Sequence, residues 1–154
     1  MLNPIPSEVD VAVIGAGSAG LPAFRAAREH TDRVILIERG PHGTTCARVG
    51  CMPSKLLIAA AEAAHGMEIA PGFGIHPGSI SIDGEAVMER VRRERDRFVG
   101  FVLDGVDRID PEQKISGQAR FVEDSRLEIG NSQVRAGRVA VSYTHLTLPT
   151  SLAV

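Results

Sequence analysis

The sequence predicts an α/β fold built on a parallel sheet, and three observations support this prediction. Residues 9–14 form an apolar run that ends at a glycine, which is typical of a buried parallel strand. Residues 17–29 then carry apolar side chains at helical spacing, and residues 33–38 form a second apolar run. A strand, a helix and a strand in this order make a βαβ unit, which takes a right-handed crossover.

The remaining elements are predicted from spacing, proline and glycine. A loop is expected at residues 41–45, followed by a helix at 51–65 that is rich in alanine and leucine and is therefore expected to be buried. A Gly- and Pro-rich loop at 66–84 precedes a second helix at 85–102. Short strands are predicted for the following ranges: 114–122, 126–129 and 133–141.

Composition excludes several classes of function. The chain has 154 residues, enough for one domain with a core, and its net charge of −2 gives no reason to expect a nucleic-acid or anionic-membrane partner. The longest apolar run, residues 56–61, is far shorter than the roughly 20 residues that span a bilayer. The first ten residues have neither the basic start nor the apolar core of a signal peptide, so we expect a cytoplasmic protein.

A glycine fingerprint follows the first predicted strand. Gly15, Gly17 and Gly20 fit G-x-G-x-x-G, with Ser18 inside the motif, directly before a predicted helix. The first glycine allows a tight turn, the second lets the backbone approach a pyrophosphate, and the third lets helix and strand pack closely. Glu38 ends the second strand, where a carboxylate would accept from ribose hydroxyls. These features predict a dinucleotide site, whether for FAD or for NAD, and a Gly-rich turn that binds nothing does not explain their spacing.

The only two cysteines of the chain, Cys46 and Cys51, are separated by four residues. Thiols are kept reduced in the cytoplasm, so a close pair there is catalytic or metal-binding. A metal site is the weaker interpretation, because the sequence has no second pair of ligand residues at the spacing that zinc sites use. Cys51 lies near the start of a predicted helix, and Lys55 adds positive charge one turn further along. The helix dipole and the lysine charge both favour the thiolate form of Cys51. Two buried, inert cysteines are the alternative. His42 is the histidine nearest to the pair and is interpreted as a surface residue.

The segment from Gly43 to Lys55 resembles the redox-active segment of the FAD-dependent pyridine nucleotide–disulfide oxidoreductases, whose pattern is G-G-x-C-x4-G-C-x-P-[SK]-K. The resemblance covers about residues 8–141. It implies a Rossmann-like FAD-binding domain, truncated in this chain. The ending Pro53-Ser54-Lys55 resembles the dihydrolipoyl dehydrogenase and mercuric reductase branch.

The resemblance also implies a role for each matching residue. The glycines of the fingerprint line the FAD pyrophosphate, Glu38 binds the adenosine ribose, and Thr45 lies close to FAD. Cys46 corresponds to the thiol that forms the mixed disulfide with substrate, and Cys51 to the thiol that lies against the flavin. Lys55 corresponds to a lysine near the reactive nitrogen of the flavin. Thr44 departs from the family, which usually has glycine there, and if that position requires a positive φ the threonine is strained.

The implied activity is oxidation of dihydrolipoamide to lipoamide, with electrons passing through Cys46 and Cys51 to FAD and then to NAD+. A homodimer and a lipoamide-type substrate are the implied partners. Mercuric reductase is the rival enzyme, and a flavin- or nucleotide-binding module without turnover is a rival of another class.

The end of the chain departs from the family. Residues 142–154 resemble the translation of a sequencing adapter, so we expect a partial FAD-binding domain at 1–141 followed by a non-native tail. A natural short protein with a β-like tail is the alternative. No NAD fingerprint and no histidine–glutamate base follow, so the fragment itself is expected to be inactive.

Overall fold

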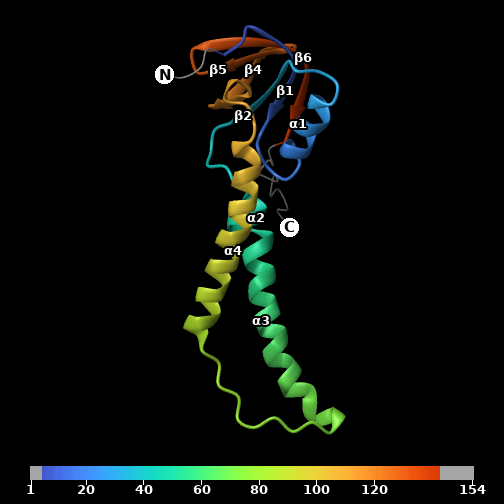
Figure 1. Cartoon of the computed structure of the whole chain (residues 1–154), viewed down its shortest axis with the longest axis vertical. Helices are drawn as coiled ribbons and strands as arrows, with labels where there is room; N and C mark the ends of the chain where they lie inside the picture. The colour runs from blue at the N-terminus through green and yellow to red at the C-terminus, as the bar shows by residue number, and fades with distance from the viewer. Residues whose placement is uncertain (1–4, 143–154) are drawn as a thin grey trace, which may run out of the picture. The chain divides into compact units, whose positions relative to one another are not determined.

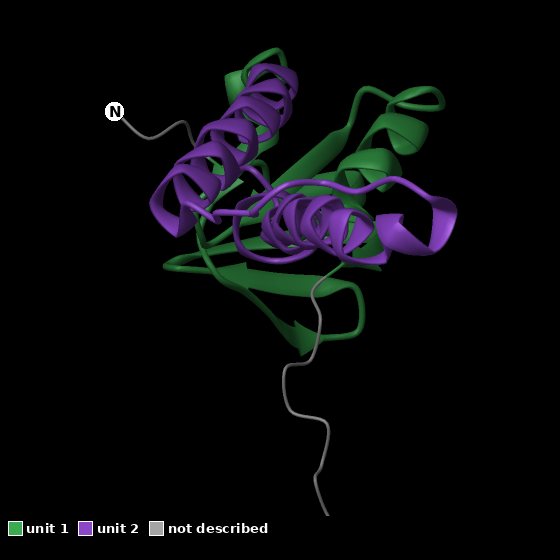
Figure 2. Ribbon diagram, turned by 90° about the horizontal axis from the view of Figure 1, so that it is seen from below, with its two compact units in different colours: residues 1–42, 107–154 green, residues 43–106 purple. Residues whose placement is uncertain are grey.

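The computed structural model of the chain describes residues 5–142. The chain divides into two compact units, one formed by Met1–His42 with Asp107–Val154 and the other by Gly43–Val106. Figure 2 colours the two units separately. Each unit is described by itself below.

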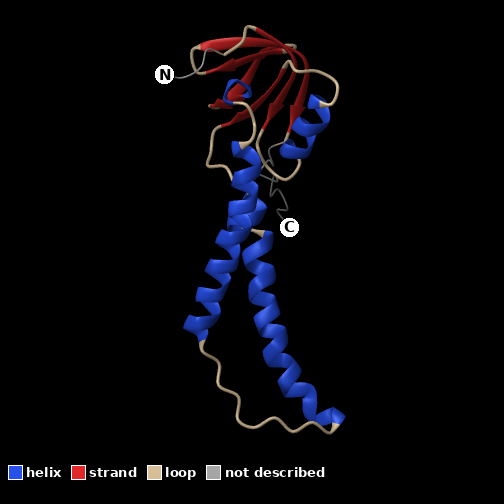
Figure 3. Cartoon of the chain, in the orientation of Figure 1, coloured by secondary structure: helices blue, strands red, loops and turns tan. Residues whose placement is uncertain are grey.

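The first unit is organised around one six-stranded sheet (Figures 1 and 3). Its strands are β1 (Glu8–Ile14), β2 (Val34–Glu38), β3 (Lys114–Ser116), β4 (Ala119–Glu123), β5 (Arg126–Ile129) and β6 (Ser132–Val141). The order is β3-β2-β1-β6-β5-β4, with parallel pairing from β3 to β6 and antiparallel pairing of β5 with both its neighbours. The predicted α/β fold with a parallel βαβ start is confirmed.

Strands β1 and β2 are largely buried on both faces, as their continuous apolar runs predicted. Alternate residues such as Ile14 and Ile37 belong to the main core cluster, which also includes Leu127. Val13 and Leu36 alternate with these residues and are also fully buried. The helix α1 (Gly20–Arg28) contacts β1, β2 and β6 and buries Leu21 and Phe24. Burial from both sides therefore fixes the strand that leads into the glycine fingerprint.

The sheet curls because its two edge strands are neighbours in sequence. Only residues 117 and 118 connect β3 with β4, although these strands lie at opposite ends of the strand order. Two residues cannot span a flat six-stranded sheet, since each residue extends the chain by at most about 3.6 Å. The single strand predicted for residues 114–122 is therefore wrong, because the chain leaves one edge of the sheet at Gly117 and joins the other.

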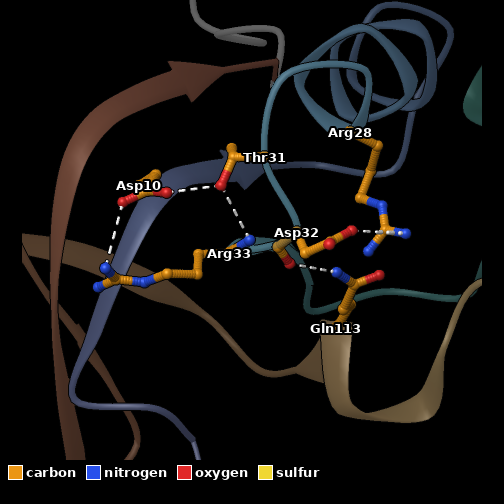
Figure 4. A network of polar contacts seen from close by, with 6 residues as sticks. All are labelled: Asp10, Arg28, Thr31, Asp32, Arg33 and Gln113. Carbon is orange, nitrogen blue, oxygen red and sulfur yellow. Dashed lines mark hydrogen bonds and ion pairs between the residues drawn. The ribbon is translucent and has the colours of Figure 1, made fainter.

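A group of polar contacts fixes the entry to β2 (Figure 4). The Thr31 hydroxyl donates to Asp10 on β1 and accepts from the Arg33 N–H at 3.1 Å, while the Arg33 guanidinium lies 3.5 Å from the Asp10 carboxylate. The Gln113 amide donates to the Asp32 carbonyl oxygen at 2.8 Å. These contacts hold the register that pairs Ile14 with Ile37, and this register places the end of β2 beside the end of β1.

The second unit is helical. It contains α2 (Thr45–Val49), α3 (Cys51–Ile69), a 3-10 helix η1 (Ala70–Phe73) and α4 (Gly84–Asp107). The predicted helices at 51–65 and 85–102 are confirmed and are longer than predicted. The loop predicted for residues 66–84 is shorter than expected, because α3 and η1 continue into it. The sequence analysis missed α2, which begins at the end of the predicted loop.

The prediction that α3 is buried is wrong. The helix is apolar on nearly every side, yet none of its residues is buried among the described part of the chain, and Leu57 and Ile58 are about half exposed. Composition reports how apolar a helix is, but it does not report what surrounds the helix. Within the described residues, no helix is both long enough and apolar enough to cross a membrane.

Candidate functional site: a glycine turn and a cysteine turn

The glycine turn connects β1 to α1 and is made by backbone that comes unusually close together. Gly15 follows β1 with φ +100°, a conformation that side-chain-bearing residues rarely adopt. A Cβ atom at Gly20 would lie 1.7 Å from the Gly15 carbonyl oxygen, so only glycine fits there. At Gly17 the nearest atom to an added Cβ is the Ser142 carbonyl oxygen, at 3.9 Å. The third glycine therefore serves packing, and the second leaves open space beside the backbone.

Glu38 closes this turn from the end of β2. One carboxylate oxygen accepts from the Ala16 N–H at 2.7 Å, and the other accepts from the Gly40 N–H at 2.8 Å. A carboxylate has about four lone-pair positions, so two remain for hydroxyl donors of a ligand. The sequence predicted a ribose-binding role for Glu38 but did not predict that Glu38 also holds the glycine turn.

The start of α1 suits a negatively charged group. Its N-cap residue, Ala19, makes no side-chain capping hydrogen bond, and Ser18 beside it is exposed. The Leu21 N–H already donates to the Gly17 carbonyl oxygen at 3.1 Å and Pro22 has no N–H, so the start of α1 favours an anion such as a pyrophosphate mainly through the positive end of the helix dipole. Together with the open space at Gly17 and the spare acceptors of Glu38, these features fit the ADP half of FAD.

Replacing Glu38 with glutamine is expected to lower the free energy of unfolding by about 1–2 kcal/mol. The amide keeps one acceptor oxygen, so its NH2 group faces either the Ala16 or the Gly40 N–H, and a charge-assisted bond is lost. Urea unfolding followed by circular dichroism measures the change. Glu29→Gln removes the same charge from an exposed helix end and is expected to stay within about 0.5 kcal/mol of the parent. Equal effects of the two substitutions would contradict the role of Glu38 in the turn.

The cysteine turn belongs to the second unit. Cys46 is the second residue of α2 and is half-buried, whereas Cys51 is the first residue of α3 and is exposed. Both are thiols in the structure. The two helices are in contact, and only Gly50 separates them. The prediction that Cys51 lies near the start of a helix is therefore confirmed, and Cys46, for which no helix was predicted, also proves to be helical.

Gly50 makes the corner between the two cysteines tight. A Cβ atom there would lie 3.2 Å from the Thr45 carbonyl oxygen and 3.5 Å from the Cα of Cys46. The close approach at Gly50 is thus to the backbone of α2. This packing folds α2 back against the start of α3, as a bond between the two sulfurs requires.

Thr44 holds the start of α2. Its hydroxyl accepts from the Ala47 N–H at 3.0 Å, and its carbonyl oxygen accepts from the Arg48 N–H at 3.1 Å. Its backbone has φ 57° and ψ 144°, so the positive φ considered from the sequence is observed. Such a conformation costs a non-glycine residue about 1–3 kcal/mol. Sequence reasoning noted the strain but missed the capping role, for which the preference of threonine for N-cap positions was the available signal.

The other candidate residues are placed as follows. Lys55 is exposed on α3, one turn after Cys51, and Thr45 is exposed as the first residue of α2. His42 has a buried Nδ1 atom with no hydrogen-bond partner among the described residues, so the interpretation as an ordinary surface histidine is incomplete. The first unit thus contains Gly15, Gly17, Ser18, Gly20 and Glu38, and the second contains Thr45, Cys46, Cys51 and Lys55. No cluster of metal-ligating side chains occurs in residues 5–142.

Comparison with known proteins gives the family of the chain. The pyridine nucleotide-disulphide oxidoreductase family matches residues 9–135. Similar curated proteins include a mercuric reductase from Streptomyces lividans, 34% identical over 94% of this chain and 30% of its own length. They also include a dihydrolipoyl dehydrogenase from Chlamydia muridarum, 35% identical over 78% of this chain and 26% of its own. A glutathione reductase from Burkholderia cepacia is 30% identical over 88% of this chain and 30% of its own length.

A solved structure supports the fold. The HOCl-induced flavoprotein disulfide reductase RclA from Escherichia coli matches with a TM-score of 0.65 and 20% identity, over 90% of this chain and 29% of that one. The chain thus spans about 30% or less of the length of these proteins. Because the family match covers both the glycine turn and the cysteine turn, the chain belongs to the pyridine nucleotide-disulphide oxidoreductase family.

Proposed function

We propose that this chain carries the FAD-binding and disulfide-bearing part of a dihydrolipoyl dehydrogenase. The observation that carries the proposal is the cysteine turn, in which Gly50 folds the helix of Cys46 against the start of the helix of Cys51. The chain also holds a glycine turn that fits the ADP half of FAD, and the family binds FAD. A disulfide and a flavin site in one polypeptide support electron transfer between a dithiol substrate and a nicotinamide.

The chemistry of the two cysteines follows from thiol–disulfide exchange. A thiolate of dihydrolipoamide attacks the sulfur of Cys46 in the Cys46–Cys51 disulfide, and Cys51 leaves as a thiolate. The second substrate thiol then attacks the mixed disulfide, which forms lipoamide and returns Cys46 to the thiol form. Two electrons have then moved from the substrate to the cysteine pair, and one S–S bond has replaced another.

The other residues bind and orient. Glu38 and the glycine turn hold the adenosine and pyrophosphate part of FAD, while Thr45 and Lys55 lie on the helices that carry the cysteines. FAD held by these residues would supply a two-electron acceptor for the reduced cysteines, with NAD+ as the proposed final acceptor. We further propose a homodimer in the cytoplasm, where thiols stay reduced unless they cycle in catalysis, as this pair would.

Mercuric reductase is the second candidate. Mercuric reductases are among the similar proteins, and one from Serratia marcescens is 37% identical over 79% of this chain. The ending Pro53-Ser54-Lys55 is common to this branch and to dihydrolipoyl dehydrogenases, so the cysteine turn supports both. A second pair of thiols that accepts Hg(II) would favour mercuric reductase.

Sequencing the source locus across the codons for Val139 to Thr150 tests whether the chain continues. We propose that residues 142–154 are a non-native tail and that the natural frame continues into an NAD-binding domain. Apart from Ser142, these tail residues lie outside the described part of the structure. A frame that encodes the tail and then stops would overturn this proposal and leave a flavin-binding module without turnover.

An activity assay on the gene product of the continued frame tests the proposed function. We expect reduction of lipoamide with NADH as donor, and at least tenfold lower rates with NADPH and Hg(II) or with glutathione disulfide. A Cys46→Ser variant is the matched control, because it keeps the glycine turn and lacks the attacked sulfur. Faster turnover of Hg(II) than of lipoamide would replace the first candidate with the second.

A further inference from the structure

The start of α2 combines features that a purely structural turn does not need. Thr44 adopts φ 57° although it carries a branched side chain, and Gly43 before it has φ +104°. Gly43 is buried, and a Cβ atom there would lie 3.0 Å from the Val99 side chain and 3.1 Å from the Arg48 side chain, so glycine suits this position. The chain therefore enters α2 through two residues of positive φ, and a threonine occupies the second of them.

What the threonine adds is a hydroxyl acceptor. Its oxygen accepts from the Ala47 N–H at 3.0 Å, which glycine could not do. A helix of five residues is too short to be stable by itself, so its formation depends on this cap and on the Gly50 corner. Cys46 lies between the cap and the corner, and Cys51 lies immediately beyond the corner.

We propose that Thr44 is a positioning residue for the cysteine pair and that its hydroxyl favours the disulfide form over the dithiol form. A disulfide requires its two Cα atoms to lie about 4.4–6.8 Å apart, so it requires α2 to be folded against α3. The structure shows α2 folded with both cysteines as thiols, but the dithiol form does not require this arrangement, so its short α2 helix can also open. An interaction that stabilises α2 therefore stabilises the disulfide more than the dithiol. This inference rests on the proposed function, because it assumes that the two cysteines form a disulfide.

The test is the equilibrium of the purified 154-residue chain with glutathione. In the oxidation, the thiols of Cys46 and Cys51 give two electrons and two protons to glutathione disulfide. One S–S bond forms between the cysteines, the S–S bond of the reagent breaks, and two glutathione thiols result. Acid quenching, alkylation of remaining thiols and mass spectrometry give the equilibrium constant for each variant.

The variants separate the hydroxyl from the backbone strain. Thr44→Val keeps the branched shape without the acceptor, and we expect the equilibrium constant for disulfide formation to fall about fivefold, the factor that corresponds to one N-cap bond. Thr44→Ser keeps the acceptor and is expected to have the same equilibrium constant as the parent. Thr44→Gly relieves the strain and so remains folded even where valine does not, and its equilibrium constant is expected to fall about twofold.

A helix N-cap elsewhere in the second unit provides a control for a general loss of stability. Asp83 accepts from the Ala86 N–H at 3.0 Å at the start of α4, so Asp83→Ala also removes a helix cap. The Asp83→Ala variant is expected to have a lower free energy of unfolding and the same disulfide equilibrium constant as the parent. An unchanged equilibrium in the valine and glycine variants, or an equal shift in Asp83→Ala, would overturn the role of Thr44. A chain in which no variant forms a disulfide between Cys46 and Cys51 would overturn the proposed redox function as well.

Discussion

Replacing Gly20 with alanine is expected to destabilise the first unit by about 4 kcal/mol or more. The added Cβ atom would lie 1.7 Å from the carbonyl oxygen of Gly15 and 2.9 Å from its carbonyl carbon. Both atoms are backbone, and Gly15 is held in place by its own N–H, which donates to the Ile37 carbonyl oxygen at 2.8 Å. The clash cannot be relieved by a rotating side chain, so α1 has to move away from the sheet. Urea unfolding followed by circular dichroism measures the loss.

Gly17→Ala is the matched control, because it adds the same methyl group three residues earlier in the same motif. Its nearest neighbour would be the Ser142 carbonyl oxygen at 3.9 Å, which is an ordinary contact distance. We expect stability within about 1 kcal/mol of the parent. The methyl group occupies the space through which a pyrophosphate approaches the backbone, so FAD affinity is expected to fall at least tenfold in a titration followed by flavin fluorescence. Equal stability of the two variants would contradict the assignment of Gly20 to packing.

The glycine turn and its flanking elements were predictable because their determinants are local. The apolar runs of β1 and β2 and the glycine motif all lie within about thirty residues of one another. Each of these patterns is typical of one kind of local structure. The second role of Glu38 was not predictable, because it depends on the strand register that places this side chain beside the Ala16 N–H. Register is a property of the paired strands and not of either strand alone.

The second unit shows where sequence patterns stop being sufficient. Five residues are too few to show a helical period, so α2 is determined by the Thr44 cap and by the close packing at Gly50. For α3, the alanine- and leucine-rich sequence predicted the helix correctly and its burial wrongly. The break between β3 and β4 at Gly117 likewise follows from the curl of the whole sheet. In each case the missing information concerns what the segment packs against.

Replacing Cys51 with serine is expected to abolish turnover in the gene product of the continued frame, with a loss of about 10³-fold or more. Serine cannot form the disulfide, so the substrate dithiol has no acceptor for its electron pair. The resemblance assigns Cys51 to the flavin side of the pair, so the long-wavelength absorption of a thiolate against a flavin is expected to disappear. Cys46→Ser is expected to lose the same activity but to keep that absorption, because the flavin-side thiol remains.

Cys46→Ser lacks the sulfur before Gly50, and Cys51→Ser lacks the sulfur after it. Comparison of the two variants therefore separates the roles of the two cysteines. Ala61→Ser, on the exposed surface of α3, changes neither sulfur and is expected to retain activity and absorption. The exposed position of Cys51 and the half-buried position of Cys46 do not by themselves decide which thiol meets the substrate. Long-wavelength absorption that survives in Cys51→Ser and disappears in Cys46→Ser would therefore exchange the two roles while leaving the disulfide chemistry in place. Turnover that persists in both variants would remove the cysteine pair from the reaction altogether.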